Sequence, residues 1–238
     1  MKLEDLKIKI FADGADAKEM LSLYKEGKVQ GFTTNPSLMK KAGITDYKAF
    51  AKEVVKSIPD MPLSFEVFAD DFETMEKEAE IIGALGENVY IKIPIINSKG
   101  ESSAALIKKL SDKGYKLNIT AIFTVEQVRV AVDALSAGTT NIISVFAGRV
   151  ADTGRNPEKI IIESREICRE KEGVNLLWAS CRELYNIVEA DRLGCDIITV
   201  GNDILSKLDY FGKDLQESSL DTVKGFVKDA KALGFTIL

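Results

Sequence analysis

The stretch from residue 89 to residue 122 decides the fold, and it reads VYIKIPIINSKGESSAALIKKLSDKGYKLNITAI. Its two ends, 89–94 and 117–122, are short and mostly apolar, as expected of strands that are covered on both faces. Between them, an apolar stripe of helical spacing is formed by Ala105, Leu106, Leu110 and Tyr115. A strand, a helix and a second strand in this order predict two parallel strands joined by a crossover helix.

The same alternation extends along the whole chain. Eight short, mostly apolar runs are predicted strands, at 7–13, 30–34, 63–69, 89–94, 117–122, 141–146, 175–180 and 196–201. Further amphipathic stretches lie at 15–26, 125–135, 160–168, 184–193 and 222–233. Eight such units in 238 residues fit one closed (β/α)8 barrel, a TIM barrel of the α/β class, with residues 1–238 forming a single domain. Residues 216–238 are then a C-terminal helical segment, with packing on a neighbouring subunit as one interpretation.

An open, doubly wound sheet is the alternative architecture. It predicts a glycine-rich phosphate loop after the first strand. Residues 13–16 read Asp-Gly-Ala-Asp and match neither common form of that loop. No linker rich in Pro, Gly or Ser and no internal repeat divides the chain. The barrel is therefore the favoured prediction.

The composition excludes several classes of function. The 32 Lys and Arg residues against 37 Asp and Glu leave a formal net charge of -5, which argues against a nucleic-acid binder that neutralises phosphates in bulk. Because the chain has no histidine, a Ser-His-Asp triad, a Cys-His dyad and an imidazole-held zinc site are all excluded. Proton transfer must then use carboxylates, lysine, tyrosine, thiol or water. Three cysteines without CxxC spacing, no signal-peptide pattern and no apolar run of ~20 residues predict a cytoplasmic protein.

Polar side chains mark the carboxyl ends of the predicted strands, where the chemistry of such a barrel gathers. A single one of these side chains has a simple alternative interpretation as a surface residue. Eight polar strand ends together predict a polar site at one mouth of the barrel. In chain order the residues are Asp13, Thr33, Asn35, Glu66, Lys92, Asn118, Thr120, Ser144, Ser180, Arg182 and Asn202.

Lys92 is the sharpest candidate, because aliphatic residues flank it on both sides within its predicted strand. Lysine is rarely buried without a partner, and burial favours the neutral amine. A neutral amine in an apolar pocket can attack a ketone carbonyl and form a Schiff base. The alternatives are an edge-strand lysine in water and a buried ion pair with Glu66.

Two carboxylates and two arginines also follow strand ends. Asp13 and Glu66 are candidates for a general acid and base, while the competing interpretation makes either one a helix N-cap. Arg149 and Arg182 carry the planar fork that binds a phosphate or a carboxylate, so the pair indicates an anionic substrate. For one arginine alone, an exposed ion pair with a loop Glu is the simpler interpretation. Arg155, in the following loop, is a weaker candidate for a third contact.

Several motifs resemble those of the transaldolase family. Four of them are Gly31-Phe32-Thr33-Thr34-Asn35-Pro36-Ser37-Leu38, Tyr90-Ile91-Lys92-Ile93-Pro94, Leu117-Asn118-Ile119-Thr120-Ala121-Ile122-Phe123-Thr124 and Ile143-Ser144-Val145-Phe146-Ala147-Gly148-Arg149. A fifth, Ala179-Ser180-Cys181-Arg182, resembles the late arginine motif, although the family often has an aromatic residue in place of Cys181. The resemblance covers residues 8 to 201 in family order.

The resemblance implies a class I Schiff-base enzyme, a transaldolase without a metal or an organic cofactor. Lys92 would attack the ketose carbonyl, Asp13 would take the C4 hydroxyl proton, and Glu66 with Thr120 would hold a proton-shuttling water. Contacts to the substrate would come from Thr33, Asn35, Asn118, Ser144 and Phe146 around the dihydroxyacetone unit, and from Arg149, Ser180 and Arg182 at the terminal phosphate.

The resemblance also implies the reaction, which is transfer of a dihydroxyacetone unit from fructose 6-phosphate or sedoheptulose 7-phosphate to an aldose phosphate, as in the pentose phosphate pathway. Transaldolases tend to have Glu and Phe where fructose 6-phosphate aldolases have Gln and Tyr, so Glu66 and Phe146 favour transfer. The alternatives are that aldolase, a transaldolase acting on 6-deoxy-6-sulfofructose, and a non-catalytic sugar-phosphate binding barrel. The expected partners are sugar phosphates and further copies of the chain in a pentamer or decamer, with no nucleic acid and no membrane.

Overall fold

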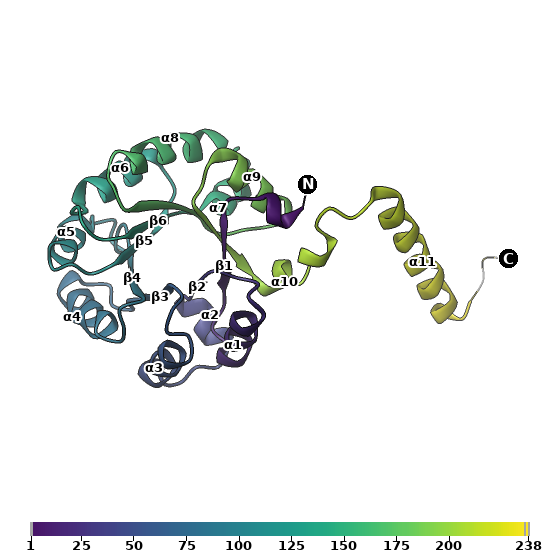
Figure 1. Ribbon diagram of the computed structural model, residues 1–238, viewed down its shortest axis with the longest axis horizontal. Coiled ribbons are helices and arrows are strands. Elements are labelled where there is room, and N and C mark those ends of the chain that lie inside the picture. Colours follow the sequence, from purple (N-terminus) through teal and green to yellow (C-terminus); the bar gives the residue numbers. More distant parts are fainter. Residues whose placement is uncertain (1, 236, 238) are drawn as a thin grey trace.

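In the computed structural model, eight parallel strands close into a barrel with helices around its outside (Figure 1). The structure describes residues 2–235 and 237. The strands are β1 (Lys9–Asp13), β2 (Phe32–Thr33), β3 (Leu63–Glu66), β4 (Val89–Pro94), β5 (Leu117–Ile122), β6 (Asn141–Val145), β7 (Val174–Trp178) and β8 (Ile197–Gly201). Each strand pairs with the next along the chain, and β8 pairs with β1. Every strand overlaps the range predicted for it, so the predicted (β/α)8 barrel is confirmed.

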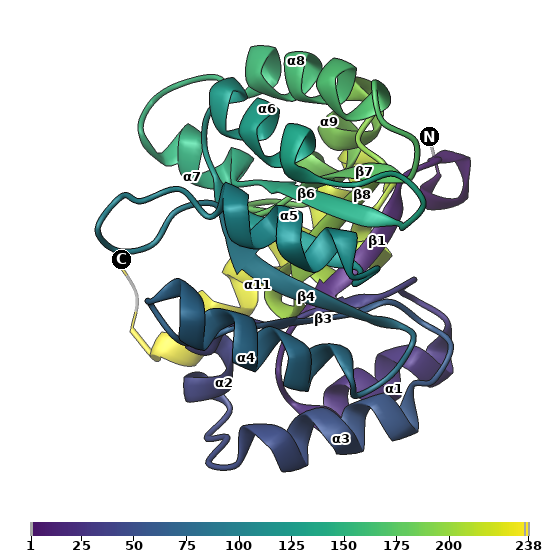
Figure 2. The same cartoon turned by 90° about the vertical axis from the view of Figure 1, so that its left-hand side faces the viewer.

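Helices cover the outer side of the barrel, and Figure 2 shows α4, α5 and α6 lying against the strands. The helices up to β8 are α1 (Ala17–Glu26), α2 (Pro36–Lys41), α3 (Tyr47–Ser57), α4 (Phe72–Gly83), α5 (Ala104–Asp112), α6 (Val125–Ala134), α7 (Ala147–Asp152), α8 (Glu158–Arg169) and α9 (Tyr185–Leu193). The barrel is followed by α10 (Asn202–Leu205) and α11 (Leu215–Leu233), and short 3-10 turns lie at Leu3–Asp5 and Leu208–Tyr210. No described helix is long and apolar enough to cross a membrane.

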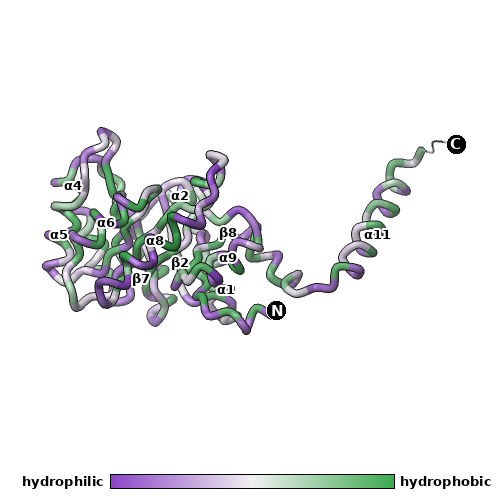
Figure 3. Tube along the Cα trace, turned by 90° about the horizontal axis from the view of Figure 1, so that it is seen from above, coloured by the Kyte–Doolittle hydropathy of each residue, from purple (hydrophilic) through white to green (hydrophobic). Residues whose placement is uncertain are grey.

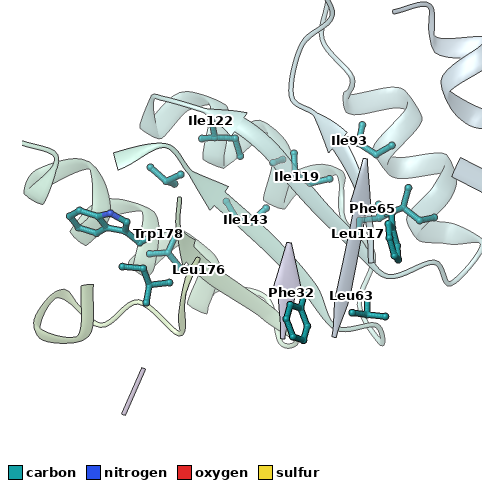
Figure 4. Close-up of a cluster of buried hydrophobic side chains, with 14 of the residues drawn as sticks. Phe32, Leu63, Phe65, Ile93, Leu117, Ile119, Ile122, Ile143, Leu176 and Trp178 are labelled. Carbon is teal, nitrogen blue, oxygen red and sulfur yellow. The ribbon is translucent and has the colours of Figure 1, made fainter. Parts of the chain in front are cut away.

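Strand residues alternate between the helices and the barrel interior, because successive side chains of a strand point to opposite faces. Ile91 and Ile93 of β4 are fully buried and belong to the large cluster that the strands share with the helices. Figure 4 shows part of that cluster, including Phe65, Leu117 and Ile143. Each fully buried aliphatic side chain of this kind contributes about 1.5–3 kcal/mol.

A second, smaller cluster fills the barrel interior, and only residues of strands and strand ends belong to it. Its buried members are Phe11, Tyr90, Ile142, Leu177, Ala179 and Ile197. Two positions further along the same strands, the inward face carries Asp13, Lys92, Ser144 and Thr199. The interior is therefore apolar toward the amino ends of the strands and polar at their carboxyl ends, where a site can form.

The long helix α11 lies apart from the barrel (Figures 1 and 3). The side chain of Asp214 caps its first turn, and Gly234 ends it in the left-handed conformation, with a φ of 71°. No residue of α11 is buried, although Phe226 and other apolar residues lie along it. The helix accounts for the predicted segment 216–238 up to residue 233, and residues 236 and 238 lie outside the described residues.

Candidate active site

A cavity of about 520 Å³ opens at the carboxyl ends of the strands, within the size range of small-molecule sites. Strands β1 to β7 and the segments that follow them contribute most of the predicted site residues to its wall, namely Asp13, Thr33, Asn35, Glu66, Lys92, Thr120, Ser144, Phe146, Arg149, Ser180 and Arg182. Two of the predicted polar residues, Asn118 and Asn202, are not part of this wall. The fold therefore gathers residues from 13 to 182 around one cavity.

Lys92 is buried at the centre of this arrangement, with only 6% of its surface exposed. Its Nζ donates a hydrogen bond to the Thr34 carbonyl oxygen at 2.8 Å and lies 3.2 Å from Oε2 of Glu66. The register of β3 and β4 places Glu66 directly beside Lys92. The interpretation of Lys92 as an edge-strand lysine in water is therefore wrong, and the buried ion pair with Glu66 is confirmed.

Thr120 presents a buried hydroxyl to the same cavity, and that hydroxyl has no hydrogen-bond partner among the described residues. An unpaired buried hydroxyl costs about 1–3 kcal/mol, so such a group marks a place for a water or a substrate oxygen. The next residue, Ala121, has a φ of 57°, and the pairing of β5 with β6 shifts register beyond Ile119. A left-handed alanine costs about 1–3 kcal/mol, and such strain is common at functional sites.

Asp13 forms a hydrogen-bonded group with two threonines. Thr33 Oγ1 donates to Oδ1 of Asp13 at 2.7 Å and also contacts Oγ1 of Thr199. The pKa of Asp13 is raised above its ordinary value, because burial and the nearby charge of Glu66 disfavour the ionised carboxylate. Lys92, the hydrogen bond from Thr33 and Arg149 act in the opposite direction but do not cancel this effect. The cap of α1 is Asp16, so the interpretation of Asp13 as an N-cap is wrong. In this structure the Thr33 hydroxyl therefore donates its hydrogen bond to the Asp13 carboxylate.

Sequence reasoning missed Thr199, which lines the cavity from β8. The residue predicted at this strand end was Asn202, which begins the short helix α10 and does not line the cavity. The signal was present, because Thr199 is a polar residue between the buried Ile198 and Val200. The same pattern pointed to Lys92.

Asn118 is fully buried and is not one of the residues that line the cavity. Its Nδ2 donates to Ser64 Oγ at 3.0 Å, and its Oδ1 accepts a hydrogen bond from Ser144 Oγ at 2.7 Å. Because the Ser144 proton points to Asn118, the lone pairs of Ser144 are the groups left for the cavity. Asn118 therefore orients Ser144 in this structure, and Ser64 is a second residue that sequence reasoning missed.

Asn35 and Cys181 also line the cavity. Asn35 caps α2 by accepting a hydrogen bond from the Leu38 backbone N–H at 3.0 Å. Burial raises the pKa of the Cys181 thiol to about 12, so this thiol stays protonated and is a poor nucleophile near neutral pH. Ser180, just before it, lines the cavity and has a φ of 64°, in the left-handed region.

The two predicted anion-binding arginines are held differently. The guanidinium of Arg149 lies 4.9 Å from the centre of the Phe146 ring, which is a cation–π contact. Arg182 forms an ion pair with Asp152, at the end of α7. Arg155 does not line this cavity, and its Nη1 donates to Thr153 Oγ1 at 3.0 Å. Arg182 is therefore in an exposed ion pair, as the simpler interpretation holds, but its partner is Asp152 at the end of α7 and not a loop Glu.

A family model described as Transaldolase/Fructose-6-phosphate aldolase matches residues 10–237. The chain belongs to this transaldolase family. A "Probable transaldolase" of Sphingopyxis alaskensis is 35% identical over 231 residues, which cover 97% of this chain and all of the relative. A "Probable transaldolase" of Brucella anthropi is 38% identical over 193 residues, or 81% of this chain and 84% of the relative. The resemblance to transaldolases is confirmed, and the membership indicates a transaldolase-type enzyme.

Solved structures of other enzymes share the barrel of this transaldolase-family chain. A 3-hexulose-6-phosphate synthase from Salmonella typhimurium has a TM-score of 0.59 at 12% identity, over 85% of this chain and 95% of that one. A dihydrodipicolinate synthase from Rhodopseudomonas palustris has a TM-score of 0.57 at 15% identity, over 84% of this chain and 72% of that one. At this level of identity the likeness shows the fold alone.

Proposed function

We propose that the protein is a transaldolase that carries a dihydroxyacetone unit from a ketose phosphate to an aldose phosphate through a Schiff base on Lys92. The observation that supports this most directly is the buried Nζ of Lys92, 3.2 Å from Glu66 in the cavity wall. The names of the relatives point to the same activity.

Formation of the Schiff base begins when Glu66 takes a proton from the ammonium group of Lys92, and the neutral amine then attacks the ketone carbon of the donor. The carbonyl oxygen leaves as water after it has received two protons, one from Glu66 and one from the attacking nitrogen, and the iminium keeps the remaining N–H. The hydroxyl of Thr120, which no described residue engages in a hydrogen bond, is available to hold the water that moves these protons between Glu66 and the substrate. Covalent catalysis of this kind divides one difficult step into two easier ones.

Cleavage of the donor is assigned to Asp13. Its carboxylate takes the proton of the C4 hydroxyl, the C3–C4 bond breaks toward the iminium carbon, and the aldose product leaves. The remaining enamine keeps the dihydroxyacetone unit on Lys92 until its C3 attacks an acceptor aldehyde and Asp13 returns the proton. Burial raises the pKa of Asp13, which brings this carboxyl closer to the range that suits a group that both takes and gives a proton.

Binding of the substrate uses both ends of the cavity. Asn35 and Ser144 would contact the hydroxyls of the dihydroxyacetone unit, with Asn118 acting through Ser144. Arg149, Ser180 and Arg182 would bind the terminal phosphate. Charged anchors of this kind hold the reacting carbon at the amine, which lowers the entropic part of the barrier.

The proposal is tested by borohydride trapping in the presence of fructose 6-phosphate. Reduction of the imine should add a dihydroxyacetone-sized mass to the peptide that contains Lys92, and Lys92→Met should lose both the adduct and turnover. An adduct on another lysine, or turnover in Lys92→Met, would contradict the mechanism. A barrel that only binds sugar phosphates would give no adduct.

Acceptor dependence distinguishes the remaining reactions. A transaldolase releases little free dihydroxyacetone without an aldehyde acceptor, whereas a fructose 6-phosphate aldolase releases it at full rate. The same assay with 6-deoxy-6-sulfofructose tests the sulfonated donor. Glu66 and Phe146 favour transfer, because transaldolases tend to have these residue types there.

A homo-oligomer is part of the proposal, with α11 as the element that contacts a neighbouring copy. The helix carries exposed apolar residues, including Leu220, Val223 and Phe226, although none of its residues is buried. A cytoplasmic location is also proposed, and it is supported by the free thiols of Cys168, Cys181 and Cys195.

A further inference from the structure

We propose that Asp152 is a positioning residue that turns the guanidinium of Arg182 toward the terminal anion of the substrate. The anion itself rests on the proposed function. The two residues lie 30 positions apart in sequence, at the end of α7 and just after β7. Asp152 makes no other contribution to the proposed chemistry, so its effect is confined to binding.

The geometry of the ion pair leaves one edge of Arg182 free. Its Nε donates to Oδ1 of Asp152 at 3.2 Å, and its Nη2 donates to Oδ2. A guanidinium has five N–H donors arranged as a rigid fork, and this contact uses two of them along the Nε–Nη2 edge. The Nη1–Nη2 edge remains for a second oxyanion, and paired N–H donors on one edge suit two oxygens of a phosphate.

The other end of Arg182 is also held. The side-chain Oδ1 of Asn186 accepts hydrogen bonds from the backbone N–H groups of Arg182, at 2.9 Å, and of Glu183, at 3.2 Å. With its backbone held by Asn186 and its guanidinium held by Asp152, Arg182 loses much of its freedom before a ligand arrives. Preorganisation of this kind saves part of the cost of ordering a long side chain on binding.

Helix α7 holds Asp152 in place relative to the cavity. Arg149, three residues earlier on the same helix, lines the cavity. Gly148 lets the helix approach the turn after β7, since its N–H faces the Ala179 carbonyl oxygen at 3.4 Å and a Cβ there would lie 1.6 Å from the Ser180 oxygen. The two arginines and Asp152 therefore belong to one packed unit.

The charge of Asp152 makes the direction of its effect testable. It cancels one of the two positive charges at this end of the cavity, so removal of the charge alone would strengthen anion binding. Removal of the positioning contact would instead weaken it. The two side chains are about half exposed, with exposures of 48% and 52%, so water and salt screen the repulsion between the Asp152 carboxylate and a bound anion. The loss of the positioning contact therefore dominates.

The experiment measures binding of inorganic phosphate and of fructose 6-phosphate to the full-length protein and to Asp152→Asn by calorimetry. We expect the variant to bind both about threefold to tenfold more weakly, which corresponds to the cost of ordering one long side chain. The KM for fructose 6-phosphate should rise by the same factor while kcat stays close to that of the wild type. With unphosphorylated fructose as donor, the kinetics should not change.

Glu170→Gln is the matched control, because Glu170 forms a similarly exposed two-point pair with Arg129. This control should leave phosphate binding unchanged. Tighter phosphate binding by Asp152→Asn, unchanged binding, or an equal loss with fructose and fructose 6-phosphate would each overturn the inference. If the wild type binds phosphate but shows neither an adduct on Lys92 nor turnover, the proposed function is contradicted. The role of Asp152 is then judged by phosphate binding alone, where weaker binding by the variant supports it and equal or tighter binding overturns it. A wild type that binds no phosphate would overturn the role of Asp152.

Discussion

Individual side chains in the barrel mouth are placed at a cost to stability. Among the described residues the Thr120 hydroxyl has no hydrogen-bond partner, Ala121 and Ser180 adopt left-handed backbone conformations, and the carboxyl of Asp13 is partly buried in the neighbourhood of Glu66. Residues at functional sites commonly break the local rules that the rest of a fold obeys. For Asp13, replacement of the carboxylate by a neutral amide should therefore raise stability while it lowers activity.

For Asp13, the cost to the free energy of unfolding should depend on pH. Because burial raises its pKa above the ordinary value of 3.8, the native state binds more protons than the unfolded chain once the pH exceeds that value. The charge of Asp13 therefore lowers the free energy of unfolding progressively from pH 3.8 up to the raised native pKa. Asp13→Asn should be more stable than the wild type at neutral pH, and its advantage should vanish in acid. Its kcat should fall by about 10²- to 10⁴-fold.

Urea midpoints measured over a range of pH test the role of Asp13. If Asp13→Asn is more stable than the wild type by the same amount at every pH, the gain comes from packing and not from removal of the charge. An Asp13→Asn variant less stable than the wild type at neutral pH would contradict the burial argument. Turnover close to that of the wild type would remove Asp13 from the proton transfer.

Among the elements, the short helix α7 matters most for the site, because Phe146, Arg149 and Asp152 lie on or beside it. Local sequence did not predict it, since its six residues (147–152) are few and no side chain caps its first turn. Longer helices with clear apolar stripes, such as 125–135 and 184–193, were predicted close to their observed bounds. Helices α3 and α4 were missed, although their buried residues lie at helical spacing, with Phe50 and Val54 on α3 and Met75, Ala79 and Ile82 on α4.

Close packing of α7 predicts a strong effect of Gly148→Ala. A Cβ at this position would meet the Ser180 carbonyl oxygen at 1.6 Å, so the backbone must move. We expect a loss of about 1–3 kcal/mol in the free energy of unfolding, together with weaker binding of phosphorylated sugars. Gly225→Ala, within α11, is the control, because a Cβ there would meet no atom of the described part of the chain within 4 Å. Urea unfolding and KM values measure both, and equal effects of the two variants would contradict the packing argument.

The whole molecule consists of a barrel that buries its own core and a helix that buries none of its residues. Helix α11 presents Phe226 with 68% of its surface exposed, along with other apolar residues at helical spacing. An isolated amphipathic helix gains little from its own apolar side. The arrangement favours association with another copy of the chain.

Phe226→Asp tests this association. If α11 packs on a neighbouring copy, the variant should weaken assembly by about 2 kcal/mol or more, the range of a central aromatic contact. Light scattering over a range of concentrations should then report a smaller mass than for the wild type. Lys228→Asp is the control, since two positions further along a helix the side chain points away from Phe226 toward the polar side. A wild-type monomer, or equal masses for all three proteins, would contradict the role of α11.

The sequence by itself determined the barrel and most of the polar residues at its mouth. Alternation of buried and polar positions is a local property, so the strands, their order and the polar residues at their ends could be predicted one segment at a time. Lys92, Glu66 and Asp13 were found for this reason, because each interrupts an apolar strand. The absence of histidine left proton transfer to carboxylates, lysine, tyrosine, thiol or water, which made Asp13 and Glu66 the natural candidates.

Only the tertiary structure decided which side chains pair with one another. Thr33 meets Thr199, 166 residues away, Asn118 turns from the cavity wall to Ser64, and Arg182 meets Asp152. These contacts depend on strand register and on the approach of α7 to the turn after β7. No local pattern carries that information, because the partners are brought together by the closure of the barrel and the packing around it.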